Sequence, residues 1–93
     1  MLFHVEQVHT PENGPYGRGG STTLFDATVA GVKVMGAYGS FVGHTMYYLV
    51  EADNLDALNQ FLVPGMKTCS ATSRPVSDHP IPKQDPSAGE FPK

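Results

Sequence analysis

The distribution of hydrophobic and polar residues predicts four β-strands along the chain. Residues 1–10 alternate between apolar and polar side chains, and residues 44–52 form an apolar run rich in strand-forming residues. A strand interrupted by glycine is predicted over 32–41, and a short strand over 67–72. Because alternation has a period of two, each strand is expected to bury one face.

Two helices are predicted between these strands. Asp53 and Asn54 are suited to cap a helix over 54–62, in which apolar residues recur at helical spacing. Ser21 can cap a shorter helix over 23–30. The predicted order is therefore strand, helix, strand, strand, helix, strand.

Two other segments have the composition of loops and tails. Residues 11–20 contain two prolines and four glycines, which predicts a loop. From residue 74 onward the chain is rich in proline and poor in apolar side chains. We therefore assign residues 1–73 to one α+β domain and residues 74–93 to an extended, proline-rich C-terminal tail.

Composition and charge narrow the classes of function. The chain has 93 residues, 40% of them hydrophobic, which suits one small domain. A net charge of -3 with six scattered lysines and arginines argues against a nucleic-acid partner. No apolar stretch is long enough to cross a membrane, and residues 1–10 lack the features of a signal peptide. Cys69 is the single cysteine, so we expect a cytoplasmic protein without an internal disulfide. We also expect no cofactor.

The predicted order of elements is that of the ferredoxin-like βαββαβ plan. With the opening MLFHVEQVHTPEN, the turn Gly43-His44-Thr45 and the run YYLVEADNLDALNQFL, the chain resembles the small dimeric α+β-barrel proteins. It most resembles a poorly characterised group of domains of about this length and of unknown function in that superfamily. The resemblance implies a four-stranded antiparallel sheet with helices on one face, a homodimer, and a pocket on or beside the sheet.

This superfamily includes plain ligand binders, cofactor-independent monooxygenases and muconolactone-isomerase-like enzymes, so the fold does not select a reaction. We expect a homodimer that binds a small apolar or aromatic molecule. The alternatives are a cofactor-independent isomerase-like or monooxygenase-like enzyme and a metal-binding protein.

The enzyme alternative depends on three polar residues of the predicted sheet. In the strand order that the resemblance implies, residues 1–10 lie antiparallel to residues 44–52. His4 would then approach Glu51, with Glu6 nearby, on the face away from the helices. An imidazole beside carboxylates on a covered face would have the perturbed pKa that a general base needs. The alternative is that these groups only form hydrogen bonds across a dimer interface.

Candidate ligand-binding residues occur on the same sheet face and in the glycine-rich loop. Tyr47 and Leu49 share the face with His4. Arg18 lies in a loop that resembles a phosphate-binding loop, although Gly20 occupies the position of its lysine. Mobility of this loop would suit a lid over a pocket.

The metal alternative depends on two histidines at one predicted sheet edge. His9 ends one strand and His44 begins its antiparallel neighbour, so the two are expected to lie close together. With Glu12 they could bind a zinc- or nickel-type ion. The chain has no HxH or HxxxH spacing, and the other interpretation is a pair of exposed histidines at a loop.

Overall fold

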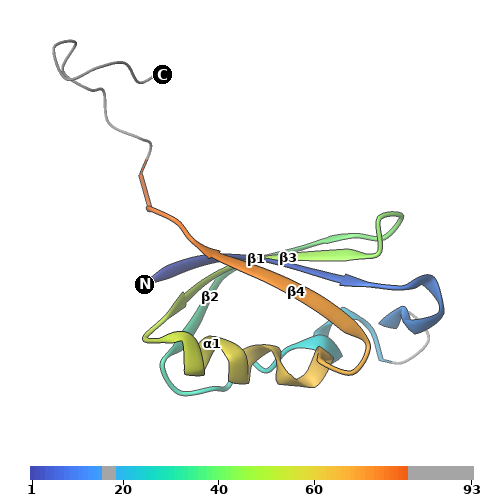
Figure 1. The fold of residues 1–93 in the computed structure, drawn as a ribbon, viewed down its shortest axis with the longest axis horizontal. Coiled ribbons are helices and arrows are strands. Elements are labelled where there is room, and N and C mark those ends of the chain that lie inside the picture. The colour runs from blue at the N-terminus through green and yellow to red at the C-terminus, as the bar shows by residue number, and fades with distance from the viewer. Residues whose placement is uncertain (16–18, 80–93) are drawn as a thin grey trace, which may run out of the picture.

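The computed structural model describes residues 1–15 and 19–79 and has an α+β fold (Figure 1). A four-stranded antiparallel sheet carries one α-helix on one side, and this confirms the predicted class. The strands are β1 (Leu2–His9), β2 (Val32–Ser40), β3 (Thr45–Ala52) and β4 (Cys69–Pro75), and the helix is α1 (Leu55–Leu62). The strand order is β2-β3-β1-β4, and every neighbouring pair is antiparallel.

The core lies between the sheet and α1. Alternation along β1 and β3 directs every second side chain toward the helix, and Tyr48, Val50 and Phe61 are fully buried there. The buried apolar residues are Phe3, Val5, Leu24, Met46, Tyr48, Val50, Ala52, Leu58 and Phe61. The Asn54 side chain accepts a 2.8 Å hydrogen bond from the backbone N–H of Ala57, so it caps α1 as predicted.

The helix predicted over 23–30 is absent, and this prediction was wrong. A short 3-10 turn, η3 (Ser21–Leu24), occupies the start of this segment, and the chain then continues without helical structure. The Asp26 carboxylate accepts hydrogen bonds from both the backbone N–H and the hydroxyl of Thr28. Such local side-chain bonds compete with helix formation, as do the β-branched residues of this segment.

A buried polar chain joins β1 to η3 and to the turn that follows α1. Gln7, which is 2% exposed, accepts a 2.6 Å hydrogen bond from the Tyr48 hydroxyl. Its side-chain amide donates a 3.1 Å hydrogen bond to the carbonyl of Leu24 in η3. Gly65, in the 3-10 turn η4 (Val63–Gly65), approaches so closely that an added Cβ would lie 2.5 Å from the Gln7 amide nitrogen. Gln7 thus connects the sheet to both turns.

The last strand begins and ends later than the sequence pattern predicted. β4 spans Cys69–Pro75 instead of residues 67–72, and the backbone N–H of Val76 still donates to the carbonyl of Leu2 at 2.9 Å. The chain therefore stays beside β1 past residue 73, where the tail was expected to begin. Residues 80–93 of that predicted tail lie outside the described residues.

Candidate functional site

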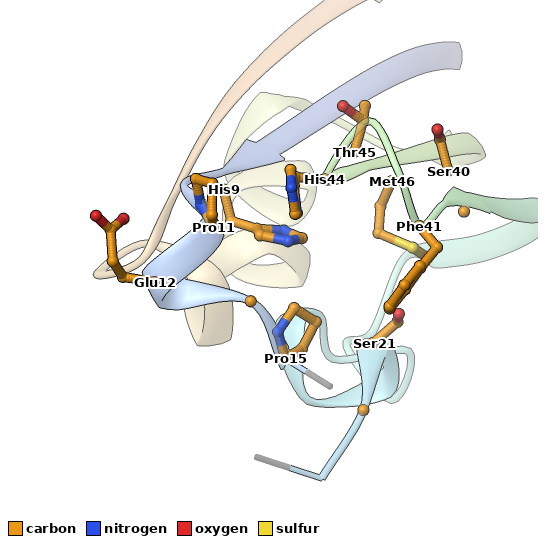
Figure 2. A pocket seen from close by; sticks show the side chains of 13 residues that line it. His9, Pro11, Glu12, Pro15, Ser21, Ser40, Phe41, His44, Thr45 and Met46 are labelled. Carbon is orange, nitrogen blue, oxygen red and sulfur yellow. The ribbon is translucent and has the colours of Figure 1, made fainter. Parts of the chain in front are cut away.

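A cavity of about 620 Å³ opens on the α1 side of the sheet, where β1 ends and β3 begins (Figure 2). The loop after β1, the start of η3 and the turn between β2 and β3 form its walls. It is lined by His9, Pro11, Glu12, Gly14, Pro15, Gly20, Ser21, Gly39, Ser40, Phe41, His44, Thr45 and Met46. Its walls are mainly apolar, with a few hydroxyl groups and two imidazole rings.

The two imidazole rings are held together by the end of the β1–β3 ladder. The backbone N–H of His9 donates a 3.0 Å hydrogen bond to the carbonyl of His44. The ring centroids are 5.3 Å apart with an interplanar angle of 73°, an edge-to-face contact. The structure thus brings together the two histidines that the sequence placed at one sheet edge.

The turn between β2 and β3 fixes the position of His44. The backbone N–H of Gly43 donates a 3.1 Å hydrogen bond to the Ser40 hydroxyl, and the Thr45 hydroxyl donates a 2.7 Å bond to the carbonyl of Gly43. His44 itself has a φ of 52°, in the left-handed region that non-glycine residues seldom adopt. Such strained positions persist where the surrounding structure holds them in place.

His9 is the least satisfied polar side chain at this site. Its Nδ1 atom is buried and has no hydrogen-bond partner among the described residues. Burial lowers the pKa of His9, and the neighbouring His44 lowers it further. The ring is therefore neutral near pH 7, a form that offers one N–H donor and one nitrogen lone pair.

The structure does not assemble the predicted metal site of two histidines and Glu12. Glu12 lies in the 3-10 turn η1 (Pro11–Asn13) at the rim of the cavity, and its carboxylate points away from both imidazole rings (Figure 2). Its pKa is lowered by hydrogen bonds from its own backbone N–H and from Thr10. Within residues 1–15 and 19–79, no three His, Cys, Asp or Glu side chains are grouped to hold a metal ion.

The residues of the enzyme alternative lie on the other side of the sheet. The outer sheet face, which we define as the side away from α1, carries Leu2, His4, Glu6, Val8, Tyr47, Leu49 and Glu51. Glu51 forms a 2.9 Å ion pair with the N-terminal ammonium group of Met1. The ring of His4 lies 6.2 Å from that of Tyr47, and no hydrogen bond or ion pair among the described residues joins His4 to Glu6 or Glu51.

The predicted ligand-binding residues do not line the cavity. Tyr47 and Leu49 are half-buried on the outer sheet face, opposite Glu6 and His4 in the β1–β3 register. Arg18 lies outside the described residues, whereas Gly20 of the same loop forms part of the cavity wall.

Sequence reasoning missed two side chains of the cavity wall. The apolar run over 44–52 predicts only a buried strand at Met46, although this residue follows His44 by two and so lies on the same side of the strand. Phe41 is 75% exposed and lines the cavity, whereas the sequence predicted it as the last residue of a strand over 32–41. The spacing His44-Thr45-Met46 was the signal available for the first of these.

Comparison with known proteins does not identify the chain. No protein-family model, no curated protein and no solved structure matches it. Among the residues that the structure describes, no helix has the length and hydrophobicity needed to cross a bilayer. The chemistry of the site is therefore the basis for assigning a function.

Proposed function

We propose that this protein binds a compact, mainly apolar or aromatic molecule in the cavity beside His9 and His44. The observation that carries the proposal is a cavity of about 620 Å³ whose mainly apolar walls include the imidazole rings of His9 and His44, 5.3 Å apart. Protein sites for small molecules commonly have this size, apolar walls and a few polar groups that orient the ligand.

The walls supply both affinity and orientation. Pro15 and Phe41 offer apolar surface, and each Å² of such surface removed from water contributes about 25 cal/mol. The imidazoles of His9 and His44 and the hydroxyl of Ser21 are the polar groups that would position the ligand.

We further infer a homodimer that buries the outer sheet face, as in the ferredoxin-like dimeric α+β-barrel arrangement. This face carries Leu2, Tyr47 and Leu49, and α1 packs only against the opposite side (Figure 1). Apolar patches of this kind are seldom left uncovered in monomers. The cavity lies on the α1 side, so dimer formation and ligand binding are separable. In the cytoplasmic location that we propose, Cys69 would stay reduced.

A protein-detected NMR screen with aromatic and heteroaromatic fragments tests the binding proposal. Binding fragments should shift the backbone signals of residues 39–46 and the imidazole signals of His9. Phe41→Ala should weaken the best fragment several-fold, because it removes part of the apolar wall. Val42→Ala is the matched control, since Val42 is the next residue of the turn, is 88% exposed and does not line the cavity. Shifts confined to Tyr47 and Leu49 would place the ligand on the outer sheet face and contradict the proposal.

A further inference from the structure

We propose that the cavity selects a weak organic acid, an aromatic or apolar molecule with one carboxylate, and binds it together with one proton. The carboxylate lies against His9 and His44, and one of these two imidazoles takes up the proton from solution. The inference rests on the proposed binding of an apolar molecule in this cavity and adds the charge that the molecule carries.

The ionisable side chains of the cavity wall can supply only positive charge to its interior. Among the described residues that line the cavity, these side chains are His9, His44 and Glu12. Glu12 is exposed, and its carboxylate points away from both imidazole rings (Figure 2). A protonated imidazole in this wall therefore has no carboxylate of the described chain as its partner, and a carboxylate on the ligand would fill that role.

No other element of the described cavity wall adds an acidic group. η3 contributes Ser21, and the turn between β2 and β3 contributes Ser40. On β4, the register places Cys69 opposite His9, and a thiol is ordinarily uncharged at neutral pH. Within residues 1–15 and 19–79, no ion pair joins His9 or His44 to an aspartate or glutamate.

The spacing of the two rings limits the uptake to one proton. Their centroids are 5.3 Å apart, and the hydrogen bond from the backbone N–H of His9 to the carbonyl of His44 keeps the residues together. Two protonated rings at this distance repel each other. One protonated ring matches the single charge of one carboxylate.

The Nε2 atom of His9 is the ring nitrogen that faces the cavity wall. Nδ1 is buried, whereas a Cβ added at Gly14, which lines the cavity, would lie 3.4 Å from Nε2. Burial and the neighbouring His44 lower the pKa of His9, so its ring is neutral near pH 7 without a ligand. A carboxylate in contact with the ring favours its protonated form and raises this pKa, so binding draws in a proton.

The apolar part of the wall is separate from the two imidazoles. Figure 2 shows the rings of His9 and His44 close together, with Phe41 apart from them and the thioether of Met46 turned toward Phe41. Gly39 on β2 leaves room for this thioether, since a Cβ added there would lie 3.1 Å from the sulfur. A molecule with an acid group at one end and an aromatic ring at the other matches this division.

Isothermal titration calorimetry with naphthoate tests the proposal, and naphthamide serves as the uncharged probe of similar shape. Titrations in two buffers with different ionisation enthalpies give the number of protons taken up per bound molecule. At pH 7 we expect more than about half a proton for naphthoate and none for naphthamide. The affinity for naphthoate should fall by up to about tenfold per pH unit above neutral pH, whereas the affinity for naphthamide should stay constant.

Variants assign the proton to the two histidines. The double variant His9→Gln, His44→Asn should take up no proton with naphthoate. Asparagine is chosen because it tolerates the φ of 52° at residue 44. His4→Gln is the matched control, since His4 does not line the cavity, and it should leave proton uptake unchanged.

Histidine NMR of the unmodified protein gives a readout that does not depend on the folding of the double variant. Saturating naphthoate should raise the titration midpoint of the His9 or the His44 ring, and naphthamide should not. A midpoint that naphthoate leaves unchanged for both rings would overturn the proposal.

Three calorimetric outcomes would also overturn it. They are naphthoate binding no tighter than naphthamide at about pH 6, uptake of less than about half a proton, and uptake that persists in the double variant. Cavity binding of naphthamide or of a fragment from the screen would leave the proposed function intact in each case. Absence of binding by both probes and by every fragment would instead contradict the proposed function itself.

Discussion

The hydroxyl of Tyr48 donates a 2.6 Å hydrogen bond to Oε1 of Gln7 in the middle of the core. The amide of Gln7 in turn donates to the carbonyl of Leu24, so the buried side chain is bonded at both ends. This chain holds η3 against the sheet, and η3 begins at Ser21 in the wall of the cavity. The position of the cavity wall therefore depends on a polar group inside the core.

Gln7→Leu should destabilise the fold, because it leaves the Tyr48 hydroxyl and the Leu24 carbonyl buried without partners. The cost is about 1–3 kcal/mol for each unpaired group. Urea unfolding of Gln7→Leu, Tyr48→Phe and the double variant measures the coupling between the two side chains. Strictly additive losses in the double variant would show that the hydrogen bond contributes nothing.

Alkaline pH should destabilise the protein through Tyr48. Burial raises the pKa of its phenol, and the nearby Cys69 raises it further. The unfolded chain releases this proton near pH 10, whereas the folded state keeps it. The free energy of unfolding should therefore fall as the pH rises above about 10. Tyr48→Phe should lose this part of the pH dependence. If its free energy of unfolding falls equally steeply with pH, groups other than Tyr48 cause the loss of stability.

Gly65→Ala should destabilise the fold by about 1–3 kcal/mol, as overpacking of a tight site usually does. The added Cβ would lie 2.5 Å from the Gln7 amide nitrogen and 2.8 Å from the Leu24 carbonyl oxygen, which belongs to the backbone. Gly14→Ala is the control, since its φ is -60° and its nearest contact is 3.4 Å. Thermal unfolding that ranks the two variants equally would contradict this packing.

Removal of the helix cap should cost about 0.5–2 kcal/mol. Asn54→Ala deletes the side-chain oxygen that accepts from the Ala57 backbone N–H, whereas Asn59→Ala changes an exposed position of α1. Denaturant unfolding should show a loss for the first variant and a change within about 0.5 kcal/mol for the second.

Assembly should depend on the outer sheet face. Leu49→Glu places a charge at the centre of that face and should convert a dimer to a monomer, whereas Val63→Glu on η4 should not. A stable dimer is expected to bury more than about 1,200 Å² in total. Sedimentation equilibrium at micromolar concentration measures the mass, and a monomeric unmodified chain would rule out the dimer.

The sequence predicted the sheet and α1 because period-two alternation and the Asn54 cap are local signals. It failed at residues 23–30 because the hydrogen bonds from Thr28 to Asp26 replace helical ones, and residue type alone does not reveal which set forms. The alternation over residues 1–10 puts Gln7 on the same side as Val5, but it does not indicate that Gln7 is buried with both of its partners inside the core.

The sequence predicted the part of the candidate site that strand pairing positions, and it did not predict the part that turns position. The resemblance implied that residues 1–10 pair with residues 44–52, and antiparallel pairing of these strands was then enough to bring His9 and His44 together. The direction of Glu12 depends on the 3-10 turn η1, which strand geometry does not determine. Met46 was not predicted at the cavity, because a methionine in an apolar strand carries no sign of a cavity beside it.

The most direct test of the proposed function is a structure of the protein with the tightest fragment from the screen bound. We expect the fragment to lie against Phe41 and Pro15, with a polar atom within hydrogen-bond distance of an imidazole nitrogen of His9 or His44. A fragment bound on the outer sheet face, with the cavity empty, would contradict it.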